Sequence, residues 1–258
     1  MTRRVFLTAL AAARVWGQTA RPRLSIVWGS GAVPAAFAEE AVVFPRAYVS
    51  CPEATLAVRA LERSRFPHAL QGADASVWDY FERGTTAGEG ITVWTSASSD
   101  GKDSPFDRSV RVPLAIRWPG VLMPHVANDV LMSHVDVMPT LLGLAGVAKP
   151  GGLQGRDVSD LLRGRAGEVP DAVFAEGALD TAMEWRILVR GFDKLIWNLK
   201  EEVVGLYNLA DDPTEQRDLR EEREGRLTRD SMLALAQQWM LRLEDGRDAH
   251  GLRLRRPE

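Results

Sequence analysis

Residues 109–156 constrain the fold of this chain more than any other part of its sequence. Within them, residues 114–118 form a short apolar run closed by a Pro-Gly pair, which predicts a buried strand followed by a turn. A helix is predicted next, with Pro139 in its first turn and Gly146 at its end. Its apolar face consists of residues at helical spacing: Met138, Leu141, Leu142 and Ala145. The pattern is that of one strand–loop–helix unit of an α/β domain.

The pattern changes to closely spaced short strands after residue 165. These predicted strands are residues 172–176, 185–190, 194–199 and 203–207. Their close spacing predicts an antiparallel meander. One helix is then predicted from apolar residues at helical spacing: Met232, Ala236, Trp239, Met240 and Leu243. We therefore expect residues 21–165 to form an α/β domain and residues 166–258 to form a C-terminal α+β subdomain.

The first 20 residues differ from the rest of the chain. Arg3 and Arg4 give a basic start, residues 6–13 form a short apolar run, and Gly17 is a small residue suited to cleavage. This pattern predicts a signal peptide of the twin-arginine type, and hence export to the periplasm or the extracellular space. A frayed N-terminal helix is the alternative interpretation. No later segment is apolar enough to span a membrane, so we expect no membrane span.

Charge and cysteine content exclude two classes of protein. The chain has a net charge of −3, which would become −6 if cleavage after Gly17 removed three arginines and no acids. This balance excludes a broad basic surface for nucleic acid. Cys51 is the only cysteine, so no intramolecular disulfide can form, and we expect it to be a small, half-buried residue.

Several segments of this sequence closely resemble the sulfatase family. They read SVRVPLAIRWPG, SHVDVMPTLLGLAG and LQGRDVSDLLRG within residues 109–164, and YNLADDPTEQRDL at residues 207–219. The resemblance implies sulfuric ester hydrolase ancestry and an alkaline-phosphatase-like α/β fold. That fold has a mixed sheet with helices on both faces, followed by a small antiparallel sheet with one helix. Residues 69–90 are much shorter than the central region of the family, so the fold is expected to be truncated there, with one helix at residues 77–84.

Residues 51–68 resemble the active-site segment of the family, and the closing Arg-Phe-Pro-His fixes the register. In that register the nucleophile position is Ala54 and the position of its arginine is Val58. Neither side chain can do that chemistry, so we predict no catalytic residue. Cys51 is a candidate substitute, but it lies three residues early. Thr55 is another, although a hydroxyl needs a metal or a base to activate it.

The resemblance also implies where a calcium ion would be held in the family. The corresponding positions are about Gly29 and Ser30 after the first strand, and Ala97 and Ser98 after the strand at residues 91–95. Calcium requires several oxygen ligands with negative charge, which these residues do not provide. We therefore expect no metal and no cofactor. A nearby acidic cluster has a cation-binding composition, but such a cluster is more often a solvated loop: Asp100, Asp103 and Asp107.

Other polar residues have two interpretations each. Lys102 matches the lysine that contacts sulfate in the family, and is our candidate substrate-binding residue, but it equally fits a solvated loop. His134 and Asp136 could form a general-base pair or belong to the scaffold. The remaining histidines have no partner pattern and are expected at the surface or in loops: His68, His125 and His250.

The favoured hypothesis is an exported sulfatase-family protein that keeps the fold but has no turnover. Loss of a nucleophile alone removes a factor on the order of 10⁶. One alternative is a binding module for sulfated or anionic glycans, or a partner of an active paralogue. Another is a chain shortened by an internal deletion that folds poorly because sheet edges are exposed. A third is an active sulfuric ester hydrolase with an unrecognised nucleophile. The substrate and the oligomeric state are left open by the sequence.

Overall fold

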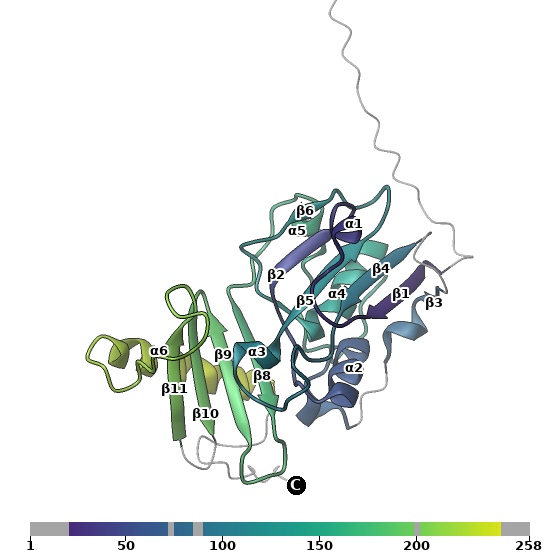
Figure 1. Cartoon of the computed structure of the whole chain (residues 1–258). Coiled ribbons are helices and arrows are strands. Elements are labelled where there is room, and N and C mark those ends of the chain that lie inside the picture. Colours follow the sequence, from purple (N-terminus) through teal and green to yellow (C-terminus); the bar gives the residue numbers. More distant parts are fainter. Residues whose placement is uncertain (1–20, 72–74, 85–89, 199–201, 244–258) are drawn as a thin grey trace, which may run out of the picture.

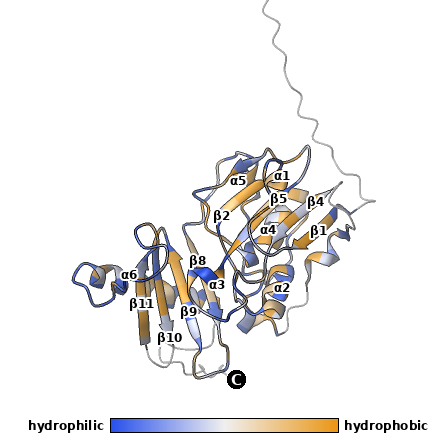
Figure 2. Cartoon of the chain, viewed as in Figure 1, coloured by the Kyte–Doolittle hydropathy of each residue, from blue (hydrophilic) through white to orange (hydrophobic). Residues whose placement is uncertain are grey.

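The computed structural model describes residues 21–71, 75–84, 90–198 and 202–243 (Figure 1). The predicted signal peptide at residues 1–20 and His250 lie outside the described residues. Two β-sheets stand next to each other, one mixed and one antiparallel, and hydrophobic residues follow their strands (Figure 2). Within the described part of the chain, no helix has both the length and the apolar character needed to cross a membrane.

The larger sheet has seven strands in the order β3-β1-β4-β5-β2-β6, and β7 also pairs with β2. Their bounds are β1 Arg23–Trp28, β2 Val42–Tyr48, β3 Glu82–Arg83, β4 Ile91–Thr95, β5 Arg111–Arg117, β6 His125–Val126 and β7 Met132–Ser133. β1 and β4 are parallel, whereas β5 runs antiparallel to both β4 and β2. The C-terminal ends of β1, β2 and β4 therefore lie at the same edge of the sheet.

Helices lie on both faces of this sheet, but unequally. The helices before the second sheet are α1 Ala35–Ala38, α2 Ala54–Arg63, α3 Asp107–Val110, α4 His134–Ala145 and α5 Ser159–Leu162. Thr95 of β4 bonds to His134 of α4, while the preceding residue, Trp94, contacts Phe37 of α1. Successive strand residues point to opposite faces. The long helix α4 thus covers one face, and the other face has only the single turn of α1.

Helix α4 begins five residues before Pro139, earlier than the predicted first-turn position. Asp136 in its first turn accepts a 2.9 Å hydrogen bond from the Ser133 N–H, which starts the helix. Pro139 is therefore inside the helix and has no N–H to donate to the Val135 carbonyl. The Ser64 hydroxyl, at the end of α2, donates to that carbonyl instead at 2.7 Å. The predicted end is confirmed, since Gly146 has a φ of 66°.

The predicted helix at residues 77–84 is wrong. This segment contains a 3-10 turn, Val77–Asp79, followed by the short edge strand β3. The turn is fixed locally, because the Asp79 carboxylate accepts a 2.7 Å hydrogen bond from the Ser76 N–H. A second 3-10 turn, Pro67–Ala69, follows α2.

The second sheet confirms the predicted meander, with the order β11-β10-β9-β8 and only antiparallel pairs. Its elements are β8 Ala172–Gly177, β9 Trp185–Arg190, β10 Asp193–Asn198, β11 Glu202–Asn208 and helix α6 Gly225–Arg242. Met232, Ala236 and Met240 are buried on one side of α6, as the helical spacing predicted. The α/β class with a mixed sheet, a small antiparallel sheet and one C-terminal helix is therefore confirmed.

The two sheets share buried side chains. Tyr48 and Val112 of the larger sheet belong to one hydrophobic cluster with Ile187 and Val189 of β9. The backbone is joined as well, because the Glu176 N–H donates to the Ser50 carbonyl at 2.9 Å. The chain passes from the larger sheet to the smaller one between α5 and β8, near the predicted boundary at residue 165. Independent domains on either side of it remain a proposal.

Candidate functional site

The residues singled out by the sequence gather at the edge where β1, β2 and β4 end. Gly29 follows β1, and its N–H donates a 2.8 Å hydrogen bond to the Thr95 carbonyl at the end of β4. Cys51 follows β2, and Ala54 is the first residue of α2. The fold therefore brings together the segments predicted to correspond to an active site, whatever their present side chains can do.

The Glu53 carboxylate caps the N-terminus of α2. The Glu53 side chain accepts hydrogen bonds from the N–H groups of Thr55 at 3.0 Å and Leu56 at 2.8 Å. Partial burial acts to raise the pKa of Glu53, but these hydrogen bonds outweigh it and lower the pKa below its usual value. Ala54 is exposed and Val58 is half-buried. The positive end of the helix is therefore already paired with an anion.

The two alternative nucleophiles have unfavourable surroundings. Cys51 is only 1% exposed, less than the predicted half-burial, and burial raises the pKa of its thiol to about 12. A thiol is a poor nucleophile until it loses its proton. Thr55 is exposed, and the carboxylate beside it is Glu53, whose lowered pKa makes it a weak base.

The positions that the resemblance assigns to calcium do not fit that ion. They hold Gly29, Ser30, Ala97 and Ser98, none with a carboxylate. The Ser98 hydroxyl is already engaged, accepting from the Gly101 N–H at 3.0 Å. In residues 21–243, apart from the undescribed segments, no three His, Cys, Asp or Glu side chains are grouped as a metal site requires. The donor set does not match the preference of calcium for charged oxygen ligands.

The acidic cluster after β4 does not converge on one point. Asp100 accepts a hydrogen bond from the Lys102 N–H at 3.0 Å, and Asp103 accepts one from the Ala178 N–H at 2.9 Å. Asp107 is buried and pairs with Lys194. Lys102 itself is exposed. Its role as a substrate contact remains a proposal.

The histidines differ in their surroundings. His134 is fully buried, bonds to Thr95 at 2.9 Å, and burial lowers its pKa to about 3. Asp136 instead pairs with Arg156 at 2.7 Å, so the two residues do not form a catalytic dyad and the geometry fits the scaffold role. His125 is exposed, as expected.

The expectation that His68 is a surface or loop residue with no partner is wrong. Its side chain is 9% exposed, and its Nδ1 lies 2.8 Å from the buried Glu176 carboxylate. Its Nε2 lies 3.2 Å from the Leu243 carbonyl, so both ring nitrogens face acceptors. Arg186 also pairs with Glu176, at 3.3 Å. Burial acts to raise the pKa of Glu176, but the charges of Arg186 and His68 lower it to about 2.

A second buried ionic cluster joins the two sheets, and sequence reasoning missed it. The Lys194 ammonium lies 2.8 Å from Asp107 and 2.7 Å from Glu215. Glu215 also accepts a hydrogen bond from the Asp107 N–H at 2.6 Å, and the Tyr48 hydroxyl donates to Asp107 at 3.3 Å. Burial raises the pKa of Glu215, although Lys194 opposes this change.

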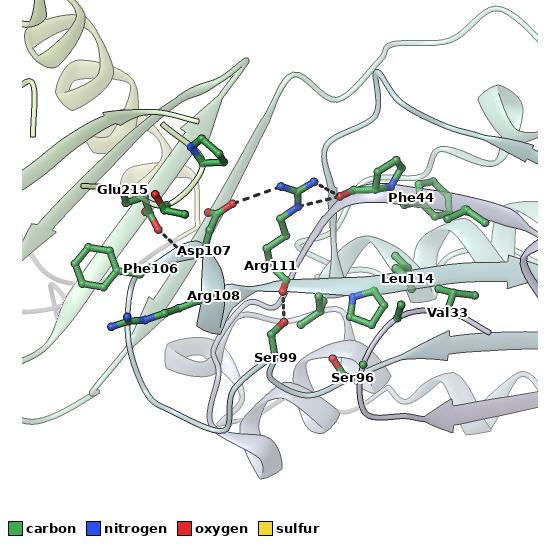
Figure 3. A pocket seen from close by; sticks show the side chains of 18 of the residues that line it. Val33, Phe44, Ser96, Ser99, Phe106, Asp107, Arg108, Arg111, Leu114 and Glu215 are labelled. Carbon is green, nitrogen blue, oxygen red and sulfur yellow. Dashed lines mark hydrogen bonds and ion pairs between the residues drawn. The ribbon is translucent and has the colours of Figure 1, made fainter. Parts of the chain in front are cut away.

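A cleft of about 960 Å³ opens beside this cluster, between the sheets and next to α1 (Figure 3). Val33, Val43 and Pro113 contribute partly exposed apolar surface to it, and Arg108 and Arg111 contribute positive charge. It reaches the loops after β1 and β4, where Gly31, Ser96 and Ser99 line it, but it does not include the start of α2, because neither Cys51 nor Ala54 is among its lining residues. The structure therefore has two sites to compare: an edge with replaced side chains and a cleft with charged ones.

Known proteins similar to this chain share both sequence and fold with it. Residues 101–239, just over half of the chain, match the family described as N-sulphoglucosamine sulphohydrolase, C-terminal. The chain is 37% identical over 82 residues to an endo-4-O-sulfatase of Bacteroides thetaiotaomicron, covering 31% of this chain and 16% of that protein. It is 41% identical over 71 residues to an extracellular sulfatase SULF-1 homolog of Drosophila melanogaster, covering 28% and 6%. The matches thus span less than a fifth of either relative.

Solved structures show the same fold at low sequence identity. BT4656, solved in complex with its substrate D-glucosamine-2-N,6-O-disulfate, has a TM-score of 0.55 and 20% identity, covering 63% of this chain and 36% of that one. Ps i-CgsB has a TM-score of 0.61 and 10% identity, covering 86% of this chain and 93% of that one. The second match therefore extends over most of this chain and most of that one.

Proposed function

The chain belongs to the sulfatase family, and from that premise we propose that it is a member without turnover, one that keeps the fold but not the catalytic side chains. The N-terminus of α2 carries this proposal. A methyl group, Ala54, stands at the nucleophile position, and the Glu53 carboxylate accepts hydrogen bonds from the first free N–H groups of the helix. A sulfate ester brought to this point would meet a negative charge and no attacking atom.

The chemistry of ester cleavage supports this proposal. Hydrolysis of a sulfate ester needs an attacking oxygen, positive charge around the sulfate oxygens and help for the leaving group. A helix N-terminus can bind an anion through its free N–H groups, but here Glu53 uses two of them. Cys51 is buried with a raised pKa, so it does not replace the missing nucleophile. Lys102 could supply only part of the positive charge.

A fluorogenic aryl sulfate tests the proposal directly. We expect no release of the phenol above buffer between about pH 5 and 9, with or without calcium, in an assay where an active sulfatase serves as the positive control. Ala54→Cys should not restore activity, because the arginine position, Val58, is apolar too. Multiple turnovers that disappear in Thr55→Ala or Cys51→Ala would refute the proposal and identify the nucleophile.

A second candidate function is binding of a sulfated or anionic glycan outside the cell. A structural neighbour was solved with a disulfated glucosamine, and a curated relative is named as extracellular, which fits the predicted signal peptide. Lys102 is exposed in the loop between Ser99 and Phe106, which both line the cleft. Export and glycan binding are therefore proposed together, without turnover.

A further inference from the structure

We propose that the cleft between the two sheets is a binding site for an acidic sugar, whose acid group lies against Arg111 and Arg108. The inference rests on the proposed function, in which the chain binds a glycan without cleaving it. The cleft is lined by residues of α1, β2, β5, α3 and the turn at residues 213–216, whereas the family nucleophile position is at the start of α2. A ligand here would need none of the missing catalytic groups.

The charges in the cleft favour an anion. Its two carboxylates, Asp107 and Glu215, are 7% and 8% exposed and both pair with the buried Lys194. The Asp107 N–H and the Tyr48 hydroxyl also donate to this cluster, which stabilises its negative charge from within. The two arginines are the groups that reach solvent, with 43% of the Arg111 side chain and 69% of the Arg108 side chain exposed. The two lining carboxylates are nearly buried and paired with Lys194, so the charge that the cleft presents to solvent is positive.

Arg111 is held in position before any ligand arrives. Its Nε and Nη2 donate to the Pro45 carbonyl at 2.9 and 2.7 Å, and Nη1 lies 3.9 Å from Asp107 (Figure 3). The contact at 3.9 Å is longer than a hydrogen bond, so Nη1 keeps donor capacity. A planar guanidinium fixed in this way loses little conformational entropy when it binds a carboxylate or a sulfate group.

Arg108 is positioned by a different kind of contact. Its guanidinium carbon lies 5.5 Å from the centre of the Phe106 ring, and its nearest recorded acid is Asp100 at 4.0 Å. These contacts are weak and exposed, so the Arg108 side chain can turn toward a ligand with little loss of free energy. Arg108 and Arg111 are three residues apart, at the start of α3 and just beyond its end.

The rest of the cleft fits the body of a sugar. Ser96 and Ser99 line it, and among the described residues no partner lies within hydrogen-bond distance of the buried Ser96 hydroxyl oxygen. A buried hydroxyl without a partner is unfavourable, and a sugar hydroxyl could satisfy it. Val33, Val43 and Pro113, which are partly exposed, provide apolar surface for the ring faces of a sugar. The volume of about 960 Å³ is in the range of small-molecule sites and exceeds what a single inorganic anion requires.

Isothermal titration with three disaccharides tests the site. The probes are a chondroitin 4-sulfate disaccharide, its desulfated form, which keeps the carboxylate, and a neutral disaccharide of the same size. We expect saturable binding of the sulfated probe, no binding of the neutral one, and weaker binding as NaCl rises from about 50 to 500 mM. Retained binding of the desulfated probe would identify the carboxylate as the recognised group, and lost binding would identify the sulfate.

Three variants locate the binding to this cleft. Arg111→Gln should weaken binding of the sulfated probe about tenfold or more, and Arg108→Gln about threefold or more, since hydrogen bonds to charged groups are among the stronger ones. Arg59→Gln removes an exposed arginine of α2 outside the cleft and should change affinity less than about twofold. Thermal melting of each variant shows whether it is folded, and Arg108→Gln keeps the test valid if Arg111→Gln unfolds.

Two outcomes would overturn the inference. One is the absence of saturable binding by either acidic probe. The other is binding that Arg111→Gln and Arg108→Gln leave unchanged. Free sulfate is measured by ion chromatography after each titration, so that binding in the cleft and the absence of turnover are tested separately. Release of sulfate would refute the lack of turnover, whereas the effect of the arginine variants decides the cleft independently.

Discussion

The Ser64 hydroxyl donates a 2.7 Å hydrogen bond to the carbonyl of Val135, the carbonyl that Pro139 leaves without its helical donor. The Val135 carbonyl is therefore hydrogen-bonded despite the proline, and its partner is the residue that ends α2. Ser64 has a left-handed conformation, with a φ of 51°. This contact holds α2, whose other end is at Ala54, the position that the resemblance assigns to the family nucleophile, against the long helix α4.

Ser64→Ala should lower the free energy of unfolding by about 1–3 kcal/mol, because it leaves the buried Val135 carbonyl without a donor. Pro139→Ala supplies a backbone N–H that can take over this role. The loss caused by Ser64→Ala should therefore be smaller in the Pro139→Ala background, which urea unfolding of the four proteins can measure. Equal losses in both backgrounds would contradict the assignment of this acceptor.

Leu142→Ala should lower the free energy of unfolding by about 2–5 kcal/mol. Leu142 is 0% exposed in the hydrophobic cluster between α4 and the larger sheet, so the smaller side chain leaves a cavity there. Leu227→Ala is the matched control, because Leu227 is 82% exposed on α6 and should change stability by less than about 0.5 kcal/mol. A melting temperature of Leu142→Ala within about one degree of the parent would show that this face is not core.

The stability of the protein should fall in acid because of Glu176. Its pKa is lowered to about 2 in the folded protein from an ordinary value of 4.5, so its contribution is complete above about pH 4.5 and is lost as the pH falls toward 2. Glu176→Gln leaves Arg186 without this carboxylate and should cost about 3–5 kcal/mol at neutral pH. The difference between parent and variant should shrink through the same acid range.

Urea unfolding at stepped pH values measures this difference. Glu39→Gln is the matched control, because Glu39 is an exposed carboxylate and its replacement should change stability by less than about 0.5 kcal/mol. A gap between the parent and Glu176→Gln that stays constant from pH 5 to about pH 2 would contradict the pairing of Glu176 with His68 and Arg186.

Calcium should not raise the melting temperature. The resemblance assigns the calcium positions to Gly29, Ser30, Ala97 and Ser98, none of which has a carboxylate. The acidic residues nearby have different partners. A site with a Kd near 10 μM would add about 2.7 kcal/mol at 1 mM calcium, which thermal scanning detects easily. A clear upward shift would disprove this expectation, and Asp100→Asn and Asp103→Asn would then locate the ion.

Local patterns were sufficient to predict most of the fold. The β-branched and aromatic residues of β4 and the short, closely spaced runs of β8 to β11 predicted strands that the structure contains. The segment at residues 77–84 was misassigned, because the Ser76–Asp79 pair stabilises a single turn that its composition does not distinguish from a longer helix. The start of α4 was placed too late, since a proline usually marks a first turn.

The ionic clusters could not be predicted in the same way. Glu176 lies 108 residues from His68, and Asp107 lies 87 residues from Lys194, so no local spacing connects these partners. A lysine within a predicted strand is ordinarily assigned to the solvated side, whereas Lys194 is 0% exposed. The cleft could not be predicted from the sequence either, because its walls come from strands and turns that meet only after both sheets have formed.

The shared core of the two sheets has a consequence for the order in which this chain can fold. Tyr48 and Val112 are covered by Ile187 and Val189 of β9, so the first 165 residues contain apolar side chains that only a later part of the chain can bury. We therefore expect these side chains to gain their native packing partners only after β9 has been synthesised. The larger sheet therefore reaches its final packing only late in synthesis, together with the smaller one.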